Sequence, residues 1–173
     1  MHCSLLDNTT IPAALIRETS GQYCVKGDLT EQDIVQAAQA ILSQKFAQGD
    51  VLHNAKMAHQ FFTTQLAALE YEVFCVAFLT TQHQVIACEQ MFRGTLSFAN
   101  VYPREVVKRA LALNAASVIL AHNHPSGSTN ISESDKMTTD ALAKALNLVD
   151  VQLVDHLVIG GTRVSSFSEM GLL

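Results

Sequence analysis

Two uninterrupted apolar segments constrain the fold of this chain most. Residues 73–79 read Val-Phe-Cys-Val-Ala-Phe-Leu, and residues 116–121 read Ala-Ser-Val-Ile-Leu-Ala. Apolar runs of this length are typical of buried β-strands. Because a polar connection at residues 80–84 leads into a second apolar stretch from residue 85, we expect an antiparallel partner for the first strand. A sheet therefore has to form the centre of the core.

Segments with helical spacing interleave with these strands. Pro103 is well placed as a first helical residue, and Gly94 marks the end or a bulge of the second strand. The predicted helices span residues 31–47, 54–69, 103–114 and 133–146, and further strands span 151–159 and 164–167. Residues 95–102 are a candidate continuation of the sheet. This order predicts an α/β (α+β) domain with a curved mixed sheet and flanking helices.

Composition narrows the class of protein. The 173 residues are 49% apolar, which suffices for a core in a single domain without disulfides. Only 16% are charged, so a partner chain or a homo-oligomer is plausible. The net charge of −5 does not support nucleic-acid binding, and the basic residues within 104–109 are typical of a solvated helix face.

Cysteine usage and hydropathy indicate the compartment. Cys75 and Cys88 fall in apolar strand-like runs, where buried free thiols are usual, and no pair has a C-x-x-C spacing. The chain has no signal-peptide pattern and no apolar run near the 18 residues of a membrane span. We expect a cytoplasmic protein with no membrane partner.

The most informative segment is Ala-His-Asn-His-Pro-Ser-Gly at residues 121–127, followed by Ser-Glu-Ser-Asp at 132–135. Residues two apart in a strand point to the same face, so His122 and His124 project together and Asn123 points away. Pro125 and Gly127 turn the chain into the next helix, whose first turn carries Asp135. Each half of the pattern alone is weak evidence, since Ser132 and Asp135 also form a common helix cap.

Two imidazoles and one carboxylate suit zinc. Zinc accepts such ligands at about 2.0–2.2 Å, and three protein ligands leave a fourth position for water, as catalytic sites do. The sequence therefore predicts a zinc site formed by His122, His124 and Asp135.

This pattern, His-x-His-Pro followed by Ser-x-x-Asp, resembles the JAMM (MPN+) signature of the JAB metalloproteases. More narrowly, the chain resembles the RadC family of bacterial proteins, from about residue 50 to the C-terminus. Further matching stretches are Phe-Arg-Gly-Thr-Leu at 92–96, Pro-Arg-Glu at 103–105, Leu-Asn-Ala-Ala at 113–116, Asp-His at 155–156 and Ser-Phe-Ser-Glu at 166–169. The resemblance implies a JAB/MPN-like, cytidine-deaminase-like fold over residues 51–173, after an N-terminal extension of residues 1–50 with one helix.

The resemblance also implies an activity. JAMM enzymes hydrolyse peptide or isopeptide bonds, with a glutamate of an early strand as general base. That role falls on Glu72, with Glu70 as its rival. Ser132 would stabilise the oxyanion, unless its hydroxyl only caps the helix. We expect His156 to orient a ligand or to be a core histidine.

A non-catalytic or DNA-repair-associated binding module is the alternative function. RadC-like proteins are associated with DNA repair, and many carry a helix-hairpin-helix region before the JAB part. Residues 1–50 lack its glycine-rich hairpins, so the chain resembles the short form of the family.

Overall fold

Six strands form the mixed central sheet of this computed structural model, which describes residues 3–4, 11–18, 22–47, 52, 54–94 and 101–173. The strand order is β1-β5-β4-β6-β7-β8, in which only β6 and β7 run parallel. The strands are β1 (Cys3–Ser4), β4 (Val73–Leu79), β5 (Val85–Arg93), β6 (Ser117–Asn123), β7 (Gln152–Gly160) and β8 (Arg163–Ser166). The predicted antiparallel pair of β4 and β5 is confirmed.

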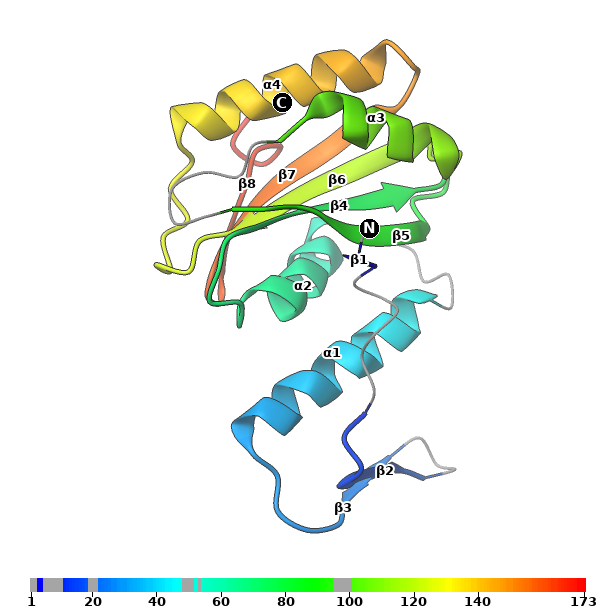
Figure 1. Ribbon diagram of the computed structural model, residues 1–173, viewed down its shortest axis with the longest axis vertical. Coiled ribbons are helices and arrows are strands. Elements are labelled where there is room, and N and C mark those ends of the chain that lie inside the picture. Colours follow the sequence, from blue (N-terminus) through cyan, green and yellow to red (C-terminus); the bar gives the residue numbers. More distant parts are fainter. Residues whose placement is uncertain (1–2, 5–10, 19–21, 48–51, 53, 95–100) are drawn as a thin grey trace.

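Helices cover both faces of this sheet (Figure 1). Helix α2 (Ala55–Leu66) packs on one face, and α3 (Pro103–Ala112) and α4 (Glu133–Asn147) pack on the other. Alternate residues of β4 enter the two cores: Cys75 and Ala77 face α2, while Val76 and Phe78 face α3 and α4. Because both faces are covered, β4 is buried along its whole length, which explains its uninterrupted apolar sequence.

The N-terminal part lies beyond the α2 face (Figure 1). It contains a short hairpin of β2 (Leu15–Arg17) and β3 (Tyr23–Val25), followed by α1 (Glu31–Ala47). The Gln39 side chain joins α1 to α2 through a 3.1 Å hydrogen bond to the carbonyl of Thr64. The sequence analysis predicted no strands in this part, because strands of two or three residues are too short for alternation to show. The division into an extension and a second domain stays a prediction.

Most predicted boundaries lie within a few residues of the observed ones, and one difference matters for the site. Strand β6 continues to Asn123 because it pairs with β4 on one side and β7 on the other up to its end. His122 and Asn123 are therefore fixed strand residues. The suggested continuation of the sheet at residues 95–100 lies outside the described residues. The predicted mixed α/β class is confirmed. No helix among the described residues is long and apolar enough to cross a membrane.

Candidate metal centre

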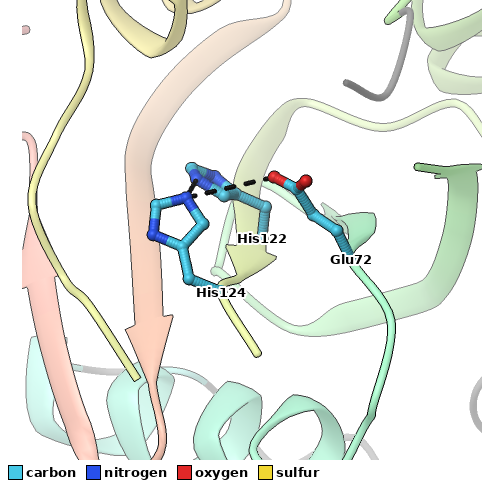
Figure 2. A group of neighbouring side chains, drawn as sticks. All are labelled: Glu72, His122 and His124. Atoms are coloured by element: carbon cyan, nitrogen blue, oxygen red, sulfur yellow. Dashed lines mark hydrogen bonds and ion pairs between the residues drawn. The ribbon is translucent and has the colours of Figure 1, made fainter. Parts of the chain in front are cut away.

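The two motif histidines converge at the end of β6, as predicted. His122 is buried in the strand, and His124 follows it directly. Their Nε2 atoms lie 3.2 Å apart, and Figure 2 shows the two rings facing a common point with the Glu72 carboxylate directed toward it. Alternation along the strand places both rings on the face that α4 covers.

His124 is anchored by the loop that follows β6. Its backbone N–H donates to the carbonyl of Ile159 at 2.8 Å, and its Nδ1 lies 3.0 Å from the carbonyl of Ser128. A carbonyl oxygen only accepts, so Nδ1 carries the proton and Nε2 presents a lone pair to the centre. The turn that brings Ser128 back requires a positive φ of 78° at Gly127.

Glu72 is positioned by Asn123, which the alternation of β6 directs to the opposite face. The Asn123 Oδ1 accepts from the buried N–H of Val73 at 2.9 Å. Its Nδ2 donates to the carbonyls of Tyr71 at 3.0 Å and Leu69 at 3.3 Å. The segment before β4 is thereby fixed, and Glu72 Oε1 lies 3.9 Å from His124 Nε2.

Asp135 approaches the same point from the first turn of α4. Its Oδ1 lies 3.5 Å from His122 Nε2. Its Oδ2 accepts from the backbone N–H of Ser132 at 2.8 Å and from the Ser132 hydroxyl at 2.6 Å, while Ser132 Oγ accepts from the Asp135 N–H. This is a capping box, which Ser132 and Asp135 close in both directions. The hydroxyl proton of Ser132 is thus engaged by Asp135.

Burial and neighbouring charges set the protonation of the centre. Burial lowers the pKa of His122 to about 4; the Asp135 carboxylate opposes this shift and His124 adds to it. Burial raises the pKa of Glu72, opposed by His124 and reinforced by the charge of Asp135. Near neutral pH His122 is therefore uncharged and able to act as a metal ligand.

The carboxylate donors offer two choices for a third ligand. Glu72, His122 and His124 each have a ligand atom within 4.8 Å of the others. Tetrahedral zinc with bonds of about 2.0–2.2 Å places neighbouring ligand atoms roughly 3.3–3.6 Å apart. The separation of 3.5 Å between Asp135 and His122 matches this range, and that of 3.9 Å between Glu72 and His124 exceeds it. The group of Glu72, His122 and His124 could hold a metal ion, and imidazole and carboxylate are ligand types that zinc accepts.

A pocket of about 710 Å³ opens beside the centre. Glu72 and His124 line it, together with Arg93, whose Cζ lies 3.6 Å from the centroid of the Tyr71 ring. Glu70 lines the pocket as an exposed residue, whereas Glu72 is half-buried within the cluster. The remaining lining residues are Gly94, Pro125 and Ser126.

The structure brings the ligand atoms of Glu72, His122 and His124 within 4.8 Å of one another, and the predicted ligand Asp135 is not part of this described three-residue group. Asp135 approaches the group through His122, and Ser132 is bonded to Asp135.

Two contributors were missed as such: Asn123, which holds the Glu72 segment, and Thr139, which contacts His156. The signal for Asn123 was present, since a polar residue alternating with two ligand candidates must be satisfied on the other face. Thr139 lies in a helix, where nothing in the local sequence separates it from Thr138.

Fold and site together define a mixed α/β domain with a candidate metal site, built on a His-x-His motif, at the C-terminal end of the inner strand β6. A family model described as the RadC-like JAB domain matches residues 52–172. The chain therefore belongs to the RadC-like JAB domain family.

Three relatives with similar sequences are all named UPF0758 proteins. A UPF0758 protein of Methylibium petroleiphilum is 51% identical over 140 residues, which cover 81% of this chain and 63% of that protein. A UPF0758 protein of Leptothrix cholodnii is 48% identical over 142 residues, 82% of this chain and 64% of the other. A UPF0758 protein of Vibrio cholerae is 41% identical over 152 residues, 88% of this chain and 96% of the other. The chain thus spans less than two thirds of the first two relatives, and the three names state no reaction.

Proposed function

We propose that this protein is a zinc-dependent hydrolase that cleaves a peptide or isopeptide bond. One observation carries the proposal: two histidine nitrogens 3.2 Å apart have the Glu72 and Asp135 carboxylates beside them, and Glu72 and His124 line a pocket. The RadC-like JAB family supports it, because JAB domains include metallohydrolases. The choice of an amide bond rests on the resemblance to the JAMM enzymes.

The ligand roles follow from the separations. His122 and His124 supply Nε2 donors, and Asp135 is our third ligand because its Oδ1 already lies 3.5 Å from His122. Zinc at such a site lowers the pKa of a bound water to about 7.

Glu72 is our general base. It lies beside His124 and lines the pocket, where the substrate has access, and its raised pKa makes the carboxylate a better proton acceptor. It can take a proton from the attacking water and pass it to the leaving amine. The oxyanion role of Ser132 requires its hydroxyl to leave Asp135, so its first role is to hold that carboxylate.

Metal binding is the first test. Protein purified without chelator should hold one zinc per chain by elemental analysis, and His122→Ala, His124→Ala and Asp135→Ala should each lose most of it. His83→Asn is a matched control, because this exposed histidine is remote from the cluster and asparagine tolerates its φ of 60°. Zinc retained by all three variants would contradict the proposal.

Hydrolysis is the second test. Zinc-loaded protein is incubated with peptide libraries and with isopeptide-linked substrates, and released amine is measured. Glu72→Gln should retain zinc but lose at least about 100-fold in rate, the lower range for general-base catalysis. Glu70→Gln, in the same pocket, should change the rate far less. Equal effects of the two variants would remove Glu72 from the base role.

We also propose a cytosolic setting for this activity. Cys75 and Cys88 are buried free thiols in adjacent strands, and burial raises the pKa of both. Such thiols suit a reducing compartment. Fractionation of cells that produce the protein, with detection by antibody, tests the assignment.

A further inference from the structure

A chain of buried hydrogen bonds runs behind the metal centre. The His122 Nδ1 lies 2.9 Å from the Nε2 of His156, and the Nδ1 of His156 lies 2.6 Å from the Thr139 hydroxyl. That hydroxyl also lies 2.6 Å from the carbonyl of Asp135. His156 is completely buried, and Thr139 is almost so. This hydrogen-bond chain therefore connects His122 on β6, through His156 on β7, to the start of α4.

The last acceptor of this hydrogen-bond chain determines which atom donates in each of its hydrogen bonds. The Asp135 carbonyl only accepts, so the Thr139 hydroxyl donates to it. With its one proton used, Thr139 Oγ1 accepts from the Nδ1–H of His156. The Nε2 of His156 is then an acceptor, and it receives the Nδ1–H of His122.

We propose that Thr139 and His156 are positioning residues that hold His122 in the Nδ1–H tautomer, so that its Nε2 lone pair faces the metal centre. This inference deepens the proposed function and rests on the proposed metal site. A reversed chain would place the proton on His122 Nε2, at the point where the ion has to bind, and would leave two oxygen lone pairs facing each other between Thr139 and Asp135.

The packing around His156 keeps its ring in the orientation that these hydrogen bonds require. The Phe167 ring stacks on it with ring centroids 4.7 Å apart and an interplanar angle of 18°, and the Phe74 ring makes a T-shaped contact with a centroid distance of 5.5 Å. Asp155 accepts from the backbone N–H of His156 at 2.7 Å and from the Ser166 hydroxyl at 2.6 Å, which ties β7 to β8. His156 is thus held from several sides and cannot easily take a different partner.

Thr139→Val is the informative variant because it keeps the side-chain volume and removes the only acceptor that the described residues offer to the His156 Nδ1–H. His156 should then carry its proton on Nε2 and donate to His122, which moves the His122 proton to its own Nε2. We expect zinc affinity, measured by competition with a chromophoric chelator, to fall about 10–100-fold, as is typical when a ligand loses its hydrogen-bonded support. Thr139→Ser keeps the hydroxyl and should retain the zinc affinity of the wild type. Thr138→Val changes a neighbouring residue that is not part of the hydrogen-bond chain, and it should leave the affinity unchanged.

The tautomer itself can be observed. Long-range ¹H–¹⁵N correlation spectra of the metal-free protein distinguish protonated from unprotonated ring nitrogens. The wild type should show protons on Nδ1 of His122 and His156, and Thr139→Val should show them on Nε2, while urea unfolding confirms that the variant is folded.

These readouts separate the two proposals. If the wild type shows the expected tautomers but holds no zinc, the metal site fails and the hydrogen-bonded chain is supported. If the wild type binds zinc and Thr139→Val binds it equally tightly, or if His122 of the wild type carries its proton on Nε2, the positioning role is overturned and the metal site stands.

Discussion

Replacing Asn123 with alanine should lower the free energy of unfolding by about 3 kcal/mol. The change removes the three hydrogen bonds that fix the segment before β4, to Val73, Tyr71 and Leu69. A typical bond contributes about 1 kcal/mol net, and a buried donor left unsatisfied costs about 1–3 kcal/mol. The 3.3 Å bond to Leu69 is the longest and should contribute least, whereas the Val73 N–H is buried and should contribute most.

Urea unfolding followed by circular dichroism measures this loss. With a slope of about 2 kcal/mol/M, the midpoint should fall by about 1.5 M at an unchanged slope. Asn130→Ala is the control, because Asn130 is exposed and should stay within about 0.5 kcal/mol of the wild type. A loss below about 1 kcal/mol for Asn123→Ala would refute the reasoning that this side chain fixes the Glu72 segment.

Three further predictions concern other parts of the molecule. In Gly160→Ala the new Cβ would lie 2.5 Å from the carbonyl oxygen of Gly127, so the loop that anchors His124 has to shift and zinc affinity should fall at least about tenfold in a chelator competition. Arg109→Ala leaves the buried Glu89 carboxylate without the guanidinium that bonds it at 2.9 Å, and calorimetry should show a loss of about 3–5 kcal/mol. In the metal-free protein, stability should fall by about 3 kcal/mol as the pH drops from 6.5 to about 4, because burial lowers the pKa of His122 to about 4 and the unfolded chain binds the proton first.

Each of these has a result that contradicts it. Gly160→Ala with unchanged zinc affinity would mean that the loop moves without disturbing His124. For Arg109→Ala, the control is Arg104→Ala, whose highly exposed side chain should matter by less than about 0.5 kcal/mol; equal effects would contradict the role of the buried pair. Urea midpoints that stay constant between pH 6.5 and 4 would show that His122 is not held neutral by the fold.

The sequence predicted the sheet well where burial is strongest. Strand β4 is covered on both faces, so its apolar run is continuous and its boundaries could be predicted to the residue. The short pairs β1–β5 and β2–β3 could not be predicted, because their few backbone hydrogen bonds impose no apolar period. The start of the helix at Glu31 could be predicted from Thr30 and Asp33, which have the spacing of a helix cap and bond to each other in the structure.

The site was predictable where ligands are close in the chain and less so where the fold brings them together. The spacing of His122 and His124 follows directly from strand geometry, and the approach of Asp135 follows from the capping box. The contribution of Thr139 depends on how α4 packs across β7, and no local pattern encodes that packing. Glu72 was preferred to Glu70 by resemblance, and only the structure shows that it lies 3.9 Å from His124.

A crystal structure of the zinc-loaded protein, with anomalous data at the zinc edge, tests the account most directly. One anomalous peak is expected at about 2.0–2.2 Å from His122 Nε2, His124 Nε2 and an oxygen of Asp135, with Glu72 uncoordinated and facing the pocket. A peak elsewhere, the absence of a peak, or an ion bound by Glu72 with Asp135 turned away would contradict it.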